Sequence, residues 1–128
     1  MQYKVHSLLR FLIIIQGLFI ASCYEQNRII PGISNDKALK LFDKGNVVFL
    51  DVRTREEHQI KSIPNSIHIP IQELGERLIE LEEYDDKMMV VYCRSGNRSA
   101  KGTKILLNNG FDAVNLLGGM INWKKTVQ

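Results

Sequence analysis

The sequence predicts an α/β fold in which a small parallel β-sheet carries helices on both faces. Two short apolar runs, at residues 47–50 and 88–92, contain no alternating polar residues. Such runs are typical of strands that are buried on both faces. Segments with helical spacing lie between these and other strand-like segments, which is the order of strand–helix–strand units. The chain has 128 residues, 45% of them hydrophobic, which is enough for one packed domain.

The predicted elements alternate along the chain. Ser34 is placed as the N-cap of a first helix that ends at Gly45, and the strand at 47–50 follows. Thr54 caps a short helix at 54–59 that has acidic residues in its first turn. Trp123 is expected to pack in the core. The later elements are a strand at 67–69, a helix at 73–81, the strand at 88–92, a helix at 100–109, a strand at 113–116 and a final helix at 120–124.

A cysteine follows directly after the second apolar run. The loop after Cys93 holds Arg94, Ser95, Gly96, Asn97, Arg98 and Ser99. Open α/β sheets usually bind their ligands at the carboxyl ends of their strands. Unpaired N–H groups and the start of a helix favour an anion here, which would be the thiolate of Cys93 itself. Arg94 and Arg98 would lower the thiol pKa further, and the thiolate is the reactive form. We therefore predict that Cys93 is a nucleophile rather than a core cysteine.

The loop resembles the active-site loop of single-domain rhodaneses, which are thiosulfate and persulfide sulfurtransferases. The resemblance covers about residues 33–125 and implies the rhodanese-like α/β fold. No single motif decides it, but five motifs occur in the right order. The other four are Asp51-Val52-Arg53, Glu56-Glu57-His58, Ile63-Pro64-Asn65-Ser66 leading to Ile69-Pro70, and Gly118-Gly119-Met120 before Trp123.

The resemblance also implies roles for the site residues. Cys93 would be catalytic and the whole loop from Arg94 to Ser99 would bind substrate, with Arg98 as the anion anchor and Arg94 nearer the mouth. Asp51 and Arg53 would support the site by pairing with each other. The alternative, in which Asp51 acts as a general base, is less favoured. His58 would pack under the following loop, although a Cys/His pair of a cysteine hydrolase is the alternative at this point.

One segment departs from the family pattern. Lys61 and Asn65 stand where glycines are usual, and Ser62 stands where histidine is usual. Asparagine tolerates a positive φ better than most residues, so Asn65 can keep the turn. The departure concerns loop detail and substrate access rather than the fold.

The implied reaction is a double displacement through a Cys93 persulfide. The donor would be thiosulfate or a persulfide, and the acceptor would be cyanide, a small thiol or an unidentified protein thiol. A persulfide carrier or redox-partner module with little turnover is the main alternative. A phosphatase is a weaker one, because cysteine phosphatases with related loops have Cys-x5-Arg, whereas Cys93 and Arg98 are spaced Cys-x4-Arg. A purely structural domain would be more credible without the cysteine.

The first residues predict a bacterial lipoprotein signal. Residues 11–24 are uncharged and follow Lys4 and Arg10, which is the length of a signal peptide core and short for a membrane span. Ile20-Ala21-Ser22-Cys23 resembles a lipobox. We expect residues 1–22 to be the signal peptide, 23–32 the lipidated cysteine and a tether, and 33–128 the rhodanese domain. The domain would then be lipid-anchored through Cys23 in the cell envelope, outside the cytoplasm, with an ordinary secretory signal or an uncleaved anchor as alternatives.

Charge and residue spacing argue against nucleic-acid binding and against a metal site. The formal net charge is +3, and removal of Lys4 and Arg10 leaves 15 basic residues against 14 acidic ones, so no nucleic-acid surface is expected. The three histidines share no ligand spacing, so we expect no metal site and no organic cofactor. With Cys23 lipidated, Cys93 would be the only thiol, without a resolving cysteine.

Overall fold

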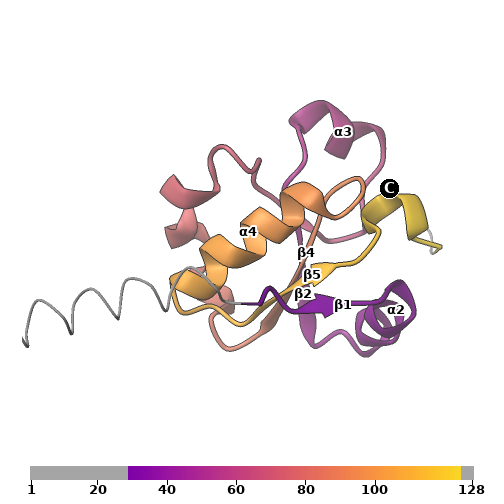
Figure 1. The fold of residues 1–128 in the computed structure, drawn as a ribbon, viewed down its shortest axis with the longest axis horizontal. Coiled ribbons are helices and arrows are strands. Elements are labelled where there is room, and N and C mark those ends of the chain that lie inside the picture. The colour runs from indigo at the N-terminus through magenta and orange to yellow at the C-terminus, as the bar shows by residue number, and fades with distance from the viewer. Residues whose placement is uncertain (1–28, 125–128) are drawn as a thin grey trace, which may run out of the picture.

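The computed structural model describes residues 29–124, and the predicted signal peptide and Cys23 lie outside this range. Within it, five parallel strands form one sheet in the order β1-β5-β4-β2-β3 (Figure 1). The strands are β1 (Gly32–Ile33), β2 (Val47–Asp51), β3 (Ile67–His68), β4 (Met88–Tyr92) and β5 (Ala113–Leu116). The two predicted apolar runs, β2 and β4, pair with each other near the middle of the sheet.

The described part of the chain also contains three α-helices and three 3₁₀ helices, of which all but the last lie between strands. The α-helices are α2 (Asn35–Lys44), α3 (Arg55–Ile60) and α4 (Asn97–Asn108). The 3₁₀ helices are η1 (Leu74–Glu76), η2 (Leu78–Tyr84) and η3 (Gly119–Asn122). Figure 1 shows α2 and α4 on opposite sides of the sheet. No helix among residues 29–124 is long and apolar enough to cross a membrane.

The sheet separates two hydrophobic cores, because alternate residues of each strand point to opposite faces. Along β4, Met89 and Val91 join Cys93 in the core under α4, η1 and η2. Val90 and Tyr92 face the other core, under α2 and η3. Both faces of the central strands are therefore covered, and the predicted fold class is confirmed.

Several local predictions are also confirmed. The Ser34 hydroxyl accepts the N–H of Lys37 at the start of α2, and Gly45 ends that helix at a φ of 69°. Thr54 and Glu57 form a reciprocal capping box at the start of α3. Asn65 keeps its turn with a φ of 61°. Each of these features depends only on residues close in sequence.

Other predicted elements were wrong or missed. Residue 32, assigned to the tether, belongs to strand β1, which is too short to show any periodicity. The helix at 73–81 is instead η1 and η2, with Gly75 inside the first, since glycine disfavours a continuous helix. The final helix is η3, of the 3₁₀ kind. Helix α4 begins at Asn97, three residues before the predicted start.

Candidate active site

Cys93 lies between the end of β4 and the start of α4, where its side chain is buried. It is 1% exposed and belongs to the core under α4. Its Sγ accepts a hydrogen bond from the backbone N–H of Gly96 over 3.1 Å. The Oγ of Ser99, in the first turn of α4, lies 3.3 Å from the same sulfur. The sulfur is thus held by a tight loop at a helix N-terminus.

The backbone of this loop depends on Gly96. Gly96 is the N-cap of α4 and has a φ of 107°, a conformation that side chains with a Cβ rarely adopt. A Cβ there would also lie 3.5 Å from the backbone of Gly118 and Leu116. The glycine therefore lets the chain reverse so that its N–H points at the sulfur.

Two opposing effects set the pKa of Cys93. Burial raises the pKa of the thiol, whereas hydrogen bonds from the backbone N–H groups of Ser99, Gly96 and Ser95 lower it, as does the Ser99 hydroxyl when its proton points to the sulfur. The pKa ends below its ordinary value. The loop therefore favours the thiolate, which is the nucleophilic form.

Helix η3 supports the loop from the other side. The N–H of Met120 donates to the carbonyl of Cys93 over 2.9 Å, and the N–H of Ile121 donates to the carbonyl of Arg94 over 3.1 Å. The preceding Gly119 has a φ of 51°, and a Cβ there would clash with both of these carbonyl oxygens. The glycine pair of the sequence motif thus lets η3 approach the nucleophile loop closely.

Asn115 belongs to the site, although no sequence motif includes it. It lies on β5, is 8% exposed, and its Oδ1 is 2.6 Å from the Oγ of Ser99. Its Nδ2 donates to the carbonyl of Gly96 over 3.1 Å. The sequence signal that could have identified Asn115 is a single amide side chain within an apolar strand, because a buried amide needs hydrogen-bond partners.

Arg98, the predicted anion anchor, has an ion-pair partner within the protein. Its guanidinium makes a bidentate ion pair with Glu57 of α3, over 2.7 and 2.8 Å. Hydrogen bonding to Arg98 is the main cause that lowers the pKa of Glu57 to about 2. The charge of Arg98 is therefore largely matched within the protein. Arg94 is exposed and makes no ion pair within residues 29–124.

Asp51 and Arg53 form the pair that the resemblance implies. The Asp51 carboxylate is fully buried and accepts from the Nε and Nη2 of Arg53, over 2.6 Å for the shortest contact. Burial raises the pKa of Asp51, but these bonds and one with His58 lower it below its ordinary value. The His58 ring contacts Asp51 over 2.9 Å and stacks on His68 at 4.4 Å between ring centroids. This placement favours the packing role of His58 over a Cys/His pair.

The same pair anchors the loop that departs from the family pattern. The Nη2 of Arg53 donates to the carbonyl of Lys61 over 2.6 Å. The hydroxyl of Tyr92 accepts the N–H of Ile63 and lies 2.9 Å from the Oγ of Ser66. These contacts hold the loop in place without its usual glycines.

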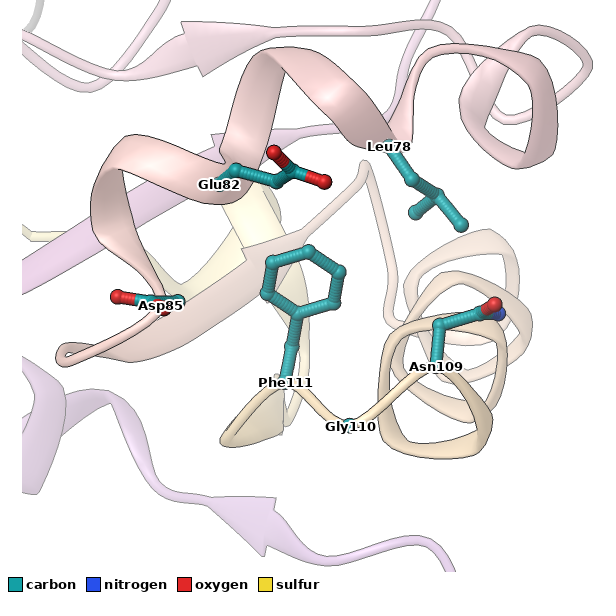
Figure 2. A pocket seen from close by; sticks show the side chains of 6 residues that line it. All are labelled: Leu78, Glu82, Asp85, Asn109, Gly110 and Phe111. Atoms are coloured by element: carbon teal, nitrogen blue, oxygen red, sulfur yellow. The ribbon is translucent and has the colours of Figure 1, made fainter.

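A separate pocket lies at the C-terminal end of α4, the end opposite Cys93, and Figure 2 shows the side chains that line it. Six residues line it: Leu78, Glu82, Asp85, Asn109, Gly110 and Phe111. Helix α4 has 12 residues, so about 18 Å separate the pocket end from the Cys93 end. Residues 29–124 contain no group of three or more His, Cys, Asp or Glu side chains placed to hold a metal ion.

Comparisons with known proteins agree with this geometry. A family model described as the rhodanese-like domain matches residues 34–126. A sulfurtransferase of Allochromatium vinosum is 33% identical over 93 residues, which cover 72% of this chain and 85% of the relative. The putative sulfur carrier protein YrkF of Bacillus subtilis is 35% identical over 101 residues, covering 77% of this chain and 54% of the relative. The crystal structure of a rhodanese-related protein from Thermoplasma volcanium has a TM-score of 0.70 and 35% identity, covering 77% of this chain and 97% of that one.

The matched relatives differ in length. The chain spans most of the Allochromatium protein but about half of the Bacillus carrier, and 41% and 28% of two other curated relatives.

Proposed function

Because the chain belongs to the rhodanese-like domain family, we propose that it is a sulfurtransferase that moves a sulfane sulfur through a persulfide on Cys93. One observation carries the proposal. The buried sulfur of Cys93 meets the N–H of Gly96 at the head of α4, where an anion is stabilised before any substrate arrives. Relatives that are named sulfurtransferases support sulfur transfer as the general activity.

In the first half of the proposed reaction, the Cys93 thiolate attacks the outer sulfur of thiosulfate. A new S–S bond forms, the old one breaks, and sulfite leaves with the electron pair of the broken bond. A persulfide donor would react in the same way and release a thiolate. The backbone N–H groups of the loop can then bind the persulfide anion. Glu57 already binds both terminal nitrogens of Arg98. The exposed guanidinium of Arg94 is therefore the one that would bind an anionic donor.

In the second half, a nucleophilic acceptor attacks the outer sulfur of the persulfide. Cyanide would leave as thiocyanate, and a thiol would become a persulfide. The bond between the two sulfur atoms breaks, and its electron pair returns to Cys93 as the thiolate. The cycle is balanced without a redox cofactor or a metal ion.

A persulfide carrier is the second candidate function. It is favoured by the likeness to the putative sulfur carrier protein of Bacillus subtilis. In such a module Cys93 would accept sulfur and keep it until a partner protein removed it. A phosphatase is less well supported, since Ser99 stands at the spacing of the phosphatase arginine.

We also propose that the domain is anchored to a bacterial membrane through lipid on Cys23 and faces outside the cytoplasm, which is the periplasmic side in a cell with two membranes. The support is the lipobox-like Ile20-Ala21-Ser22-Cys23 after an uncharged, apolar stretch. Metabolic labelling with a fatty-acid probe tests this directly. Label in the wild type but not in Cys23→Ser is expected, and label in both would contradict the proposal.

The function is tested with the full chain in detergent, carrying Cys23→Ser so that Cys93 is the only thiol. This protein and its Cys93→Ser variant are given thiosulfate, and the intact mass is measured before and after cyanide is added. One added sulfur atom and thiocyanate release, both absent in the variant, are expected. A persulfide that persists with cyanide or small thiols would indicate the carrier, and no added sulfur from thiosulfate or cysteine persulfide would refute the proposal.

A further inference from the structure

The hydroxyl of Ser99 lies between two groups that can each accept its proton. Its Oγ is 2.6 Å from the Oδ1 of Asn115 and 3.3 Å from the Sγ of Cys93. A hydroxyl carries a single proton, so it can donate to only one of them at a time. The other group must meet a lone pair of the Ser99 oxygen.

The orientation of the Asn115 amide decides between the two. Its Nδ2 donates to the carbonyl of Gly96 over 3.1 Å. Rotating the amide by half a turn would place Oδ1 against that carbonyl, and two acceptors would then face each other. The amide nitrogen must therefore point to Gly96, and Oδ1 must point to Ser99 as an acceptor.

We propose that Asn115 is a positioning residue that draws the Ser99 hydroxyl proton to its own Oδ1, so that Ser99 meets Cys93 as an acceptor of the thiol proton. The shorter of the two distances, 2.6 Å, belongs to the Asn115 bond. In the neutral state all three groups are satisfied, because Cys93 donates to Ser99 and Ser99 donates to Asn115. The hydrogen-bond chain stabilises the thiol.

Ionisation of Cys93 breaks this arrangement. Either the thiolate faces a lone pair of Ser99, or Ser99 turns its proton to the sulfur and leaves the buried Oδ1 of Asn115 without a donor. Both outcomes are unfavourable, since a buried acceptor without a partner is destabilising. The backbone N–H groups thus stabilise the thiolate while Asn115 opposes it. Since the thiolate is the attacking form in the proposed function, Asn115 would set the fraction of Cys93 that is ready to react at a given pH.

The charged groups around Cys93 come from other elements and would stay in place when Asn115 is changed. They are Arg94 in the loop, Arg98 of α4 with its partner Glu57 of α3, and Asp51 of β2 with Arg53 and His58. Helix η3 and strand β5 carry no titratable side chain. A change in the titration of Cys93 on altering Asn115 would therefore act through Ser99 or through Gly96, whose carbonyl Asn115 binds, and a double variant that lacks the Ser99 hydroxyl separates the two routes.

The test measures the rate of Cys93 alkylation by iodoacetamide between pH 5 and pH 10. It uses the full chain with Cys23→Ser, alone and with Asn115→Ala, Ser99→Ala or both. Asn115→Ala frees the Ser99 proton for the thiolate, so the midpoint of its rate profile is expected to fall by about one pH unit, a tenfold rise in thiolate on the acid side. The double variant is expected to titrate like Ser99→Ala. Ser99→Ala itself is expected to leave the midpoint unchanged or lower, because it removes an acceptor of the thiol proton.

Thr103→Val is the matched control. The Thr103 hydroxyl is also buried on α4 and donates to the carbonyl of Ser99 over 2.9 Å, but it has no bond to the sulfur. Its midpoint is expected to match the wild type.

A higher midpoint in Ser99→Ala would overturn the inference, because it would mean that Ser99 donates to the thiolate. This arm remains decisive even if Asn115→Ala fails to fold. An unchanged midpoint in folded Asn115→Ala would overturn it as well. The inference and the proposed function are separable, since alkylation needs no sulfur transfer: shifted profiles without turnover would refute only the function, and turnover with unshifted profiles would refute only the inference.

Discussion

Replacing Glu57 by glutamine removes one charge from the ion pair that joins α3 to α4. The change leaves the local capping box largely intact, because glutamine at this position can still accept the N–H of Thr54. It takes from Arg98 the carboxylate that binds both of its terminal nitrogens. The variant therefore isolates the long-range pair from the local helix cap.

The expected loss of stability follows from the titration of Glu57. Its pKa is lowered from 4.5 to about 2, which corresponds to about 3 kcal/mol before solvent screening. The side chains of Arg98 and Glu57 are 34% and 30% exposed, so water screens a good part of this. We expect Glu57→Gln to lower the free energy of unfolding by about 1–2 kcal/mol, or the melting temperature by about 5–10 °C.

The effect should depend on pH in a defined direction. A carboxylate whose pKa is lower in the folded state stabilises the fold fully above its unfolded pKa of about 4.5, and this contribution disappears as the pH falls through about 2. The difference between wild type and Glu57→Gln should therefore be constant above about pH 5.5 and shrink below pH 4.5.

Urea unfolding followed by circular dichroism, at pH 7 and at pH 3, measures both quantities. Glu56→Gln is the matched control, since Glu56 carries the same charge in the same helical turn, is exposed, and makes no ion pair with another described residue. Equal stability of Glu57→Gln and Glu56→Gln at pH 7 would refute the reasoning. A difference from wild type that stayed the same at pH 3 would refute the electrostatic part of it.

Two further substitutions test the support of the nucleophile loop. Gly119→Ala places a Cβ against backbone carbonyl oxygens at a positive φ, so we expect the free energy of unfolding in urea to fall by about 2 kcal/mol or more. The control is Gly110→Ala, where φ is also positive but the added Cβ meets nothing within 4 Å, and there we expect a loss of about 1 kcal/mol. Equal losses would contradict the close approach at Gly119. Asp51→Asn leaves the Arg53 guanidinium buried without its counter-charge, so we expect the free energy of unfolding to fall by about 3 kcal/mol or more. Thiocyanate formation per folded molecule should stay within a few fold of wild type. A hundredfold loss of turnover in folded protein would instead indicate that Asp51 is a general base.

Much of the fold could be predicted because local sequence decides it. The unbroken apolar runs that became β2 and β4 must be covered on both faces, which leaves few arrangements other than a parallel sheet between helices. The caps at Ser34 and Thr54 form between residues three positions apart. The Cys93 loop could be recognised for the same reason, since the thiol and the N–H group of Gly96 that it meets are neighbours along the chain.

The features that escaped prediction depend on distant partners or on very short segments. Strand β1 pairs only two residues with β5 and has no pattern of its own. Nothing near Arg98 in the sequence indicates that Glu57, 41 positions earlier, binds its guanidinium. Arg98 was therefore predicted to be the anion anchor without knowledge of its ion pair with Glu57.

By itself, the sequence determined the layered α/β architecture, the position of the candidate nucleophile and the loop whose N–H group points at its sulfur, because each follows from hydrophobic pattern or from adjacent residues. Only the tertiary structure decided what surrounds the sulfur. The register of β5 beside β4 brings Asn115 to Ser99 and Gly96, and the packing of α3 brings Glu57 to Arg98. Side-chain hydrogen bonds act over about 3 Å, so a group can join such a site only after the whole sheet has set its position.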